Sequence, residues 1–427
     1  MIGLISRAEP FGAAVPSTST NTASEKLNES LSDWVDRDTR HRVIRLSDQP
    51  GSSSLYFHQN SFTPGGDKLI FNTRQGIAAV DLQSLGQQRP VVDLVVSNAS
   101  ALAAAWKTRD VYFSRAGSLW AANVDTHAVR EVIAGRFTAI NCDESWAVRT
   151  VNATDPAGKT SRPEPRKILS QRERMFPGRT DLSPEEERAA QKEEGLARRL
   201  VNPACQAFVF TNIKTGSSNT NGYQFAWLNH LQFSPTDPNL LLYCHEGTWH
   251  EVDRIWTIRT DGTEQQLRHK REMDMEIAGH EFWSYDGTTI WFDLQTPRSK
   301  EFWLAGVNMV TGGKTRYRLD RDWWSIHFNA SRDGKLFAGD GGDPGQVAFA
   351  SDGMWINLFR PKPDGTLQRE RLVNMSKHNY VTGRGGAEPN VMITPDAKWV
   401  VFRSNLSGPS HVYAVEIAQS SSRTPVK

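Results

Sequence analysis

The segment FWSYDGTTIWF, residues 282–292, joins two aromatic-rich runs through the turn sequence Tyr-Asp-Gly. An Asp-Gly turn between alternating apolar residues is a strong short-range signal of a β-hairpin. The same phrase, an apolar residue followed by a Pro-Asp-Gly type of turn and a short strand, has four other clear copies: FTPGGDKLIF from Phe62, FSPTDPNLLLY from Phe233, FNASRDGKLFAGD from Phe328 and ITPDAKWVVF from Ile393. The chain is therefore built from repeated strand–turn–strand units.

Two weaker copies of the phrase complete the series: ALAAAWKTRDVYF from Ala101 and AINCDESWAVRT from Ala139. Between the copies lie further strands such as SLWAANVDT, RIWTIRTDG and HVYAVEI. Units that repeat at roughly 40–50 residues are typical of propeller blades. Seven copies predict an all-β fold, a seven-bladed β-propeller. A pair of β-sandwiches is the alternative, but that architecture requires no common phrase.

The repeats set the domain boundaries. We expect a poorly ordered leader over residues 1–38, the propeller over 39–420 and a tail over 421–427. One long insertion, residues 154–200, falls between the third and fourth copies, and we expect it between the third and fourth blades. Ser183, Pro184 and Glu186 form a helix start within it. This helix is either a solvated insertion or a lid over the propeller mouth.

Composition limits the classes of partner. The 427 residues contain 50 Lys and Arg against 48 Asp and Glu, which argues against nucleic acid or an anionic membrane as a partner. No apolar run is long enough to span a bilayer, and three cysteines cannot form a disulfide framework. Six glycosylation sequons favour a secreted or periplasmic protein over a cytoplasmic one. They begin at Asn28, Asn98, Asn152, Asn329, Asn374 and Asn405.

Polar residues gather just before the repeated phrases, where one face of a propeller would collect them. A single histidine at a strand end is usually a structural hydrogen-bonding group, but recurrence across blades predicts a site at one end of the central channel. The members are His58, Gln59, Asn60, His230, His245, Glu246, His250, Asp253, Arg254, His280, Glu281, His327, Asn329, His378, Tyr380, Arg384, Glu388 and Asn390.

Several of these stretches match a known family in order. YCHEG, VDRIW, GHEFW, HFNASRDGKLFAGDG and ITPDAKWVVFRSN followed by VYAVEI resemble the oligogalacturonate lyase family. The likeness is strongest from about Ala226 to the C-terminus and extends more faintly back to YFHQNSFTPGGDKLIF. This resemblance implies a seven-bladed propeller that cleaves uronate glycosides by β-elimination to a 4,5-unsaturated uronate, and hence an acidic oligosaccharide substrate.

The resemblance also implies roles for single residues. His280, in GHEFW, would be the Brønsted base, and Arg254, in VDRIW, would hold the uronate carboxylate. The family places a divalent metal, typically manganese, on a histidine matching His327 and on two histidines of an HPHPSFTP segment. Here that segment is AEPNVMITP, with Glu388 and Asn390 in their place. Oxygen donors suit Mn²⁺ or Ca²⁺, so we expect one of these ions, or a protein cation instead.

The remaining candidates complete the expected site. We assign His245 to the catalytic set with His280 and Arg254. The expected substrate-binding residues are His58, Asn60, His230, His250, Tyr380 and Arg384.

The chemistry explains why such residues suit elimination. Removing the proton at C5 of a uronate places negative charge beside its carboxylate, so a cation there stabilises the intermediate. Arg254 can bind a carboxylate bidentately, and a neutral histidine is a competent base. Glycoside hydrolysis would instead need facing carboxylates.

Two alternatives stay open at this point. The loss of the two histidines makes an exo-acting lyase that releases rhamnose from terminal rhamnosyl-glucuronate a rival on the same chemistry. The alternative from another class is a non-catalytic propeller that binds acidic glycans.

Overall fold

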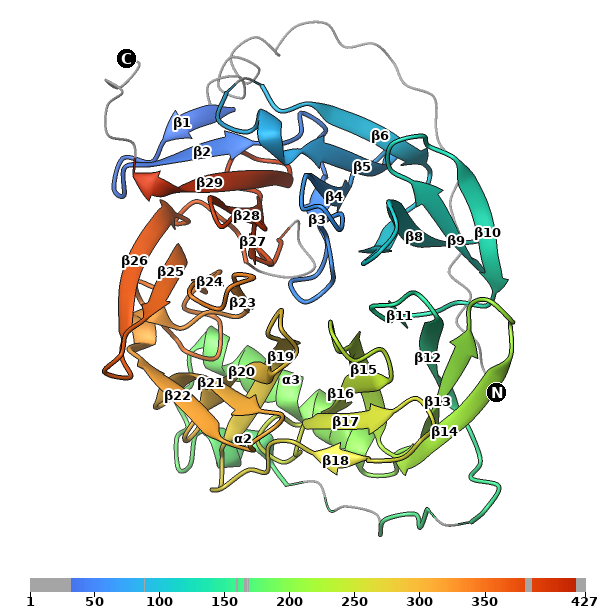
Figure 1. Cartoon of the computed structure of the whole chain (residues 1–427). Coiled ribbons are helices and arrows are strands. Elements are labelled where there is room, and N and C mark those ends of the chain that lie inside the picture. Colours follow the sequence, from blue (N-terminus) through green and yellow to red (C-terminus); the bar gives the residue numbers. More distant parts are fainter. Residues whose placement is uncertain are drawn as a thin grey trace, which may run out of the picture.

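The chain folds into seven antiparallel sheets arranged around a central channel (Figure 1). The computed structural model describes residues 32–419 apart from 88, 159, 165–166, 168 and 381–385. Six sheets have four strands and one has five. The predicted all-β, seven-bladed β-propeller is confirmed. Residues 1–31 of the expected leader, the tail from residue 420, and Arg384 lie outside the described residues.

The first three blades follow one another along the chain. Blade one contains β3 (Ser53–Ser54), β4 (Lys68–Asn72), β5 (Gly76–Asp81) and β6 (Val92–Ser97), with the 3₁₀ helix η1 (Leu82–Ser84). Blade two contains β7 (Ala101–Ala104), β8 (Asp110–Arg115), β9 (Ser118–Asn123) and β10 (Val129–Ala134). Blade three contains β11 (Ala139–Ile140), β12 (Trp146–Asn152), β13 (Cys205–Asn212) and β14 (Ser218–Phe225).

Blades four to six repeat the same order. Blade four contains β15 (Trp227–Phe233), β16 (Leu240–Glu246), β17 (Ile255–Arg259) and β18 (Gln266–Leu267). Blade five contains β19 (Ile277–Trp283), β20 (Thr289–Gln295), β21 (Phe302–Asn308) and β22 (Lys314–Leu319), followed by η2 (Arg321–Trp323). Blade six contains β23 (Phe328–Ala330), β24 (Phe337–Gly339), β25 (Trp355–Pro361) and β26 (Leu367–Asn374).

The seventh blade closes the ring with strands from both ends of the chain. Its order is β1 (Asp33–Val35), β2 (His41–Arg45), β29 (His411–Gln419), β28 (Trp399–Ser404) and β27 (Met392–Ile393). Strand β1 lies inside the segment expected as a leader. It belongs to the propeller because Trp34 packs edge-on against Tyr413 at a ring-centroid distance of 5.8 Å, and Asp33 pairs with Arg42.

The insertion lies inside the third blade, and its expected place between the third and fourth blades was wrong. Helices α2 (Gln171–Met175) and α3 (Pro184–Leu200) connect β12 to β13. These two strands pair over seven residue positions, from Trp146 opposite Asn212 to Asn152 opposite Gln206. The insertion is therefore an enlarged hairpin loop. The Ser183–Glu186 capping box at the start of α3 is present, with Pro184 in the first turn.

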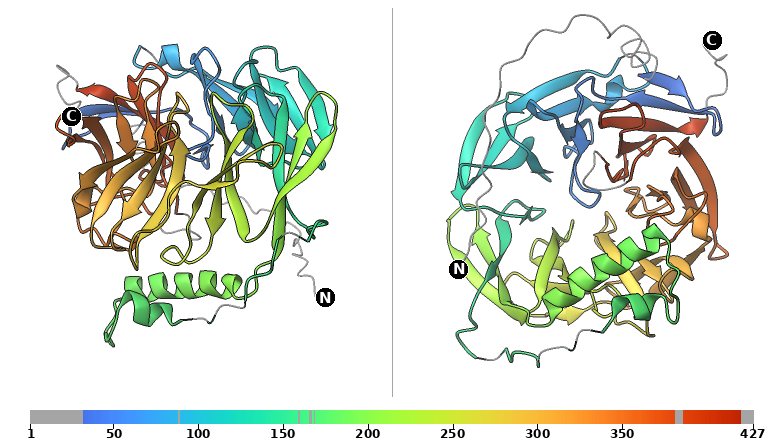
Figure 2. Two further views of the ribbon diagram at one scale, coloured as in Figure 1. Left: turned by 60° about the horizontal axis from the view of Figure 1, so that its bottom comes forward. Right: turned by 180° about the vertical axis from the view of Figure 1, so that it is seen from behind.

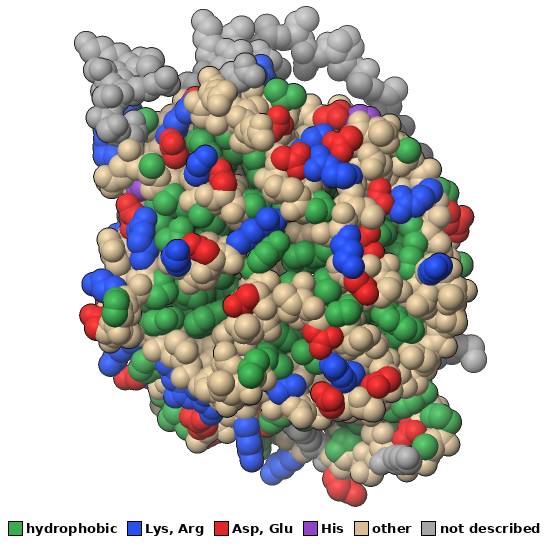
Figure 3. Space-filling model, in the orientation of Figure 1, with side chains coloured by type: hydrophobic (Ala, Val, Ile, Leu, Met, Phe, Trp, Pro, Cys, Tyr) green, Lys and Arg blue, Asp and Glu red, His purple; other side chains and the backbone are tan. Residues whose placement is uncertain are grey.

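The insertion packs against one face of the propeller, where Figure 2 shows α3 crossing blades four to six. The opposite face, which Figure 3 shows, carries basic and acidic side chains interspersed with apolar ones, in keeping with the nearly balanced charge. In the described part of the chain, no helix is long and apolar enough to cross a membrane. Cys142, Cys205 and Cys244 are free thiols.

The innermost strands of blades four and five each contain a bulge. Their pairing shifts register between Asn229 and Gln232 in β15, and between Gly279 and Phe282 in β19. A bulge inserts an extra residue and re-aims the side chains around it. His230 and His280 occupy these bulges.

Candidate active site

The site is built from equivalent positions in successive blades. His230, His280 and His327 each stand four residues before a serine of the repeated phrase, at Ser234, Ser284 and Ser331 respectively, and Asn390 stands four residues before Thr394. His230, His280 and Asn390 have positive φ angles of 49°, 50° and 52°, a region that residues other than glycine rarely adopt. Blade symmetry thus brings the four side chains to one end of the channel, on the α3 face.

His280 lies among aromatic rings. Its ring centroid is 4.7 Å from that of His327, 4.9 Å from Trp249 and 6.3 Å from Phe57. Burial holds the pKa of His280 well below its usual value, and the nearby His327 and His230 lower it further. The Nδ1 atom has no hydrogen-bond partner among the described residues. His280 is therefore a neutral imidazole with an unused nitrogen.

Arg254 is the buried cation of the site, with 1% of its surface exposed. Its Nη1 donates to Glu246 Oε2 at 3.0 Å, and its Cζ lies 4.2 Å from the Trp249 ring centroid. Its Nε and Nη2 have no acceptor in the described parts of the chain. Unpaired buried donors are costly, so an anionic ligand oxygen placed beside these two N–H groups would be stabilised.

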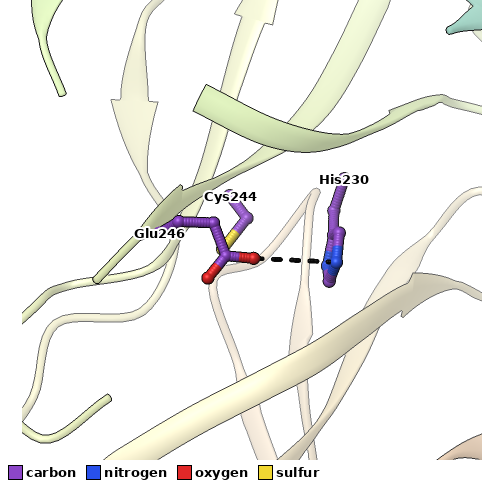
Figure 4. Close-up of side chains that lie close together, drawn as sticks. All are labelled: His230, Cys244 and Glu246. Carbon is purple, nitrogen blue, oxygen red and sulfur yellow. Dashed lines mark ion pairs between the residues drawn. The ribbon is translucent and has the colours of Figure 1, made fainter. Parts of the chain in front are cut away.

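His230 lies between two carboxylates, Glu246 and Glu281, of which Figure 4 shows Glu246. Its Nε2 is 3.7 Å from Glu246 Oε1 and its Nδ1 is 3.4 Å from Glu281 Oε1. Burial alone would lower the pKa of His230, but Glu281 and then Glu246 outweigh it and raise the pKa. The environments of His230 and His280 therefore shift their pKa values in opposite directions, which is typical of an acid and a base in one site.

His230, Cys244 and Glu246 form one group of possible metal ligands. Ligand atoms of His230, Cys244 and Glu246 all lie within 4.8 Å of one another. However, Glu246 is already paired with Arg254, and burial raises the pKa of the Cys244 thiol well above its usual value. A divalent cation there would lie beside a guanidinium and a protonated thiol, so this group fits an ion poorly.

His327 forms a second group of possible ligands. Its Nδ1 is 2.8 Å from Asp340 Oδ2, and its Nε2 is 3.2 Å from Tyr56 Oη and 3.9 Å from Glu388 Oε2. The buried Oδ1 of Asn390 has no partner among the described residues. A carboxylate on one imidazole nitrogen commonly orients the other towards a metal. His327 Nε2 and Glu388 Oε2, 3.9 Å apart, together with the unpaired Asn390 Oδ1, are the donor atoms that suit an oxygen-rich divalent ion.

Comparison with known proteins agrees with this geometry. Residues 194–421, or 228 of the 427, match the family model described as oligogalacturonate lyase. The chain belongs to the oligogalacturonate lyase family. It is 28% identical over 229 residues to an oligogalacturonide lyase of Pectobacterium atrosepticum and to an oligogalacturonate lyase of Dickeya dadantii. Each match covers 52% of this chain and 58% of the relative, so the chain spans little more than half the length of these curated relatives.

Solved structures of the same family share the fold. An oligogalacturonate lyase in complex with manganese superposes with a TM-score of 0.67 at 19% identity, over 91% of this chain and 96% of the other. An oligogalacturonate lyase from Vibrio parahaemolyticus gives the same TM-score at 20% identity, over 91% and 97%. The seven-bladed architecture is thus that of the oligogalacturonate lyases.

Most of the predicted site residues lie close together at one end of the central channel. His58 joins the cluster, with its ring centroid 5.0 Å from Tyr56 and 5.8 Å from His230. Those brought together are His58, His230, Arg254, His280, Glu281, His327, Glu388 and Asn390.

Other predicted residues lie elsewhere. His245 stacks on Trp256 at 4.7 Å and bonds to Gln224, because it points to the opposite face of β16 from Glu246. Asn60 donates to the backbone oxygens of Ala104 and Ala105, a structural role.

Two further members support the site from a distance. His250 is buried against Arg298, with 3.3 Å between Nδ1 and Nη1. Tyr380 donates to the backbone oxygen of Asp340 at 2.8 Å, and so holds the residue that orients His327. Arg384 lies outside the described residues.

Three residues of the site were not predicted from the sequence: Tyr56, Trp249 and Asp340. Tyr56 precedes the predicted His58 by two positions, Trp249 lies within CHEGTWHEVD, and Asp340 directly follows β24. Aromatic residues are so frequent in this chain that Tyr56 and Trp249 cannot be told by residue type from those that pack between strands. The signal that could have found Tyr56 and Trp249 was their position inside segments already singled out for polar residues.

Proposed function

We propose that this protein is a carbon–oxygen lyase that cleaves a uronate glycoside by β-elimination and leaves a 4,5-unsaturated uronate. One observation carries the proposal. The unused nitrogen of neutral His280 and the two unpaired N–H groups of Arg254 belong to side chains that both lie against the Trp249 ring, at 4.9 Å and 4.2 Å from its centroid. A base and a carboxylate-binding cation are the two groups that this elimination requires.

Arg254 would bind the carboxylate at C5 of the uronate. Its free Nε and Nη2 form one edge of the guanidinium, and this edge matches a carboxylate bidentately. The contact strengthens as charge develops on the carboxylate during proton removal, so it stabilises the transition state more than the bound substrate. Glu246 and Trp249 hold the guanidinium in place.

His280 and His230 would divide the proton transfers. His280 takes the proton from C5, the electron pair forms the C4–C5 double bond, and the bond from C4 to the glycosidic oxygen breaks. His230, kept protonated by Glu281 and Glu246, gives a proton to the departing oxygen. No atom is gained or lost, and both histidines return to their starting states by exchange with water.

A divalent cation would assist at the His327 group. His327 Nε2, a Glu388 oxygen and Asn390 Oδ1 are the atoms that would hold Mn²⁺ or Ca²⁺, and the ion would supply additional positive charge against the substrate carboxylate. With one nitrogen and two oxygen donors, affinity for transition metals should be lower than with three imidazoles.

The substrate class follows from family membership. The curated relatives are named as lyases of oligogalacturonides or oligogalacturonates, so an acidic oligosaccharide of that kind is the first candidate here. The departure at Glu388 and Asn390 favours a second candidate, terminal rhamnosyl-glucuronate. In both, the reacting unit is a uronate with a leaving oxygen at C4.

An absorbance assay tests the proposal. The conjugated C4–C5 double bond absorbs in the ultraviolet, so incubation with oligogalacturonates and, separately, with a rhamnosyl-glucuronate glycan should give rising absorbance with one of them. His280→Ala is the control that removes the base. Binding of either glycan without any product would favour the non-catalytic propeller, and the lyase proposal would fail.

A further inference from the structure

The insertion helix α3 contacts the propeller through one narrow face. Its buried residues, Ala190, Glu193, Ala197 and Leu200, are three or four positions apart, as on one side of a helix. Three of them are apolar, but Glu193 is a carboxylate with only 2% of its surface exposed. A buried carboxylate is costly unless it is paired. The hydrogen-bond partners of Glu193 therefore show which parts of the propeller α3 contacts.

Glu193 binds two separate segments of the blades beneath it. Its Oε1 accepts from Nη1 of Arg298 at 2.9 Å, and its Oε2 accepts from the backbone N–H of Trp249 at 3.2 Å. The same helix packs Leu200 against Gly247, where a Cβ would lie 2.7 Å from Leu200 Cδ1. Helix α3 thus contacts the segment 247–250 at two points, Gly247 and Trp249.

Trp249, which α3 holds in place, contacts both of the proposed reactive groups, Arg254 and His280. Its ring lies 4.2 Å from Arg254 Cζ and 4.9 Å from the His280 ring centroid. A Cβ on Gly279 would overlap the indole, so the ring lies directly against the backbone that carries His280. A shift of Trp249 would therefore move Arg254 and His280 relative to each other.

We propose that Glu193 is a positioning residue, which acts through Trp249 to fix the distance between the Arg254 guanidinium and the His280 imidazole. This inference rests on the proposed elimination, in which those two groups act on the same uronate. Misplacement of about 1 Å can cost on the order of a hundredfold in rate. The insertion then completes the active site, in addition to covering one side of the mouth.

Glu193→Ala tests the inference, since it removes both contacts. We expect kcat to fall by about tenfold or more while KM changes less than about threefold, because geometry and not ground-state binding is lost. Glu193→Gln keeps an acceptor for the Trp249 N–H and should recover most of kcat. Glu187→Ala is the matched control, since it removes a carboxylate from the same helix that pairs with Arg172 of α2; kcat should stay at the wild-type value.

A double variant separates positioning from general destabilisation. Because Glu193 acts through Trp249, adding Glu193→Ala to Trp249→Ala should cost little beyond Trp249→Ala alone. If the double variant instead loses kcat by the product of the two single losses, Glu193 does not act through Trp249 and the proposal is overturned. If Glu193→Ala does not fold, Trp249→Ala alone decides, because it leaves the Glu193–Arg298 pair intact; an unchanged kcat in that variant would also overturn it.

Amide hydrogen exchange tests the positioning role without a measurement of activity. In Glu193→Ala, amides of residues 247–254 should exchange faster than in the wild type, while Glu187→Ala should match the wild type over that segment. An unchanged exchange rate there refutes the positioning role whatever the activity. A wild-type protein that forms no unsaturated product from any uronate refutes the proposed function instead.

Discussion

Two sides of the same channel mouth differ in how tightly their side chains are packed and buried. On the base side, blades four and five contribute His280, Arg254 and Trp249, packed against each other and anchored by Glu193 of the insertion. On the ion side, blades six and seven contribute His327, Glu388 and Asn390.

The ion side is more open. The Glu388 side chain is 34% exposed, whereas that of Arg254 is fully buried. The base side carries the HEFW and VDRIW phrases on which the resemblance to the oligogalacturonate lyases rests, whereas on the ion side Glu388 and Asn390 stand where that resemblance implies histidines. The difference suggests that proton removal is the constrained part of the proposed reaction, while charge neutralisation can be supplied by different donors.

Removing the base should have the largest effect. His280→Ala should lower kcat by on the order of a hundredfold or more, because a positioned general base contributes at least that much. The rate of unsaturated-uronate formation measures it, with circular dichroism to verify the fold. His127→Ala, an exposed histidine of blade two, is the control. Near wild-type turnover in folded His280→Ala would remove this residue from the mechanism.

Arg254→Lys should be the next most damaging change on the base side. A lysine keeps the charge but cannot make a planar two-point contact with a carboxylate. We expect a loss of roughly tenfold or more, mainly in kcat, since the arginine acts on developing charge. Arg259→Lys, at the other end of β17, should have little effect. If only KM rises in Arg254→Lys, the arginine binds the ground state and does not act in the chemical step.

Metal removal tests the ion side and should have a smaller effect. Treatment with excess EDTA should reduce activity several-fold, and added Mn²⁺ or Ca²⁺ should restore it, because one nitrogen and two oxygen donors hold such ions only moderately.

The reciprocal change on the ion side is Asn390→His. It should tighten Mn²⁺ binding more than Ca²⁺ binding in calorimetric titrations, since it adds an imidazole. Full activity in protein shown by elemental analysis to be metal-free would instead assign the neutralising role to Arg254 and other protein cations.

The repeated phrase was enough to predict the fold because its turn chemistry is local. It also predicted that His230, His280 and His327 would meet, since each stands at the same distance from its turn. His245 could have been set aside on the same reasoning. Side chains alternate along a strand, so His245 must face away from Cys244 and Glu246 on either side of it.

What the sequence did not predict depends on long-range pairing. The N-terminal strand β1 is held by β2, which pairs with β29 at the other end of the chain, and no local signal marks that closure. Glu193 reaches Trp249 across 56 positions of sequence. The sequence predicts the insertion between blades because the phrase marks only the first strands of a blade, and β13 carries no copy of it.

The last prediction concerns stability beneath the base side and should leave activity nearly unchanged. Asp293 lies opposite Gly279 in the sheet of blade five and accepts a hydrogen bond from Trp324 Nε1 at 2.9 Å. Burial raises its pKa from 3.8 to about 7. Between these values the folded protein holds a proton that the unfolded chain releases, so the free energy of unfolding falls as the pH rises through about 7.

Asp293→Asn should remove this loss, because an amide stays neutral and still accepts the bond from Trp324. Urea unfolding should therefore show the variant stabilised relative to the wild type at pH 8, by on the order of a few kcal/mol, and much less at pH 5. Asp181→Asn, at a largely exposed carboxylate, should show no such difference between the two pH values. Equal stability differences for Asp293→Asn at pH 5 and pH 8 would mean that Asp293 is ionised in the folded protein throughout this range. The buried carboxylate would then have to be stabilised by its hydrogen bonds from Trp324 and Gln295 alone.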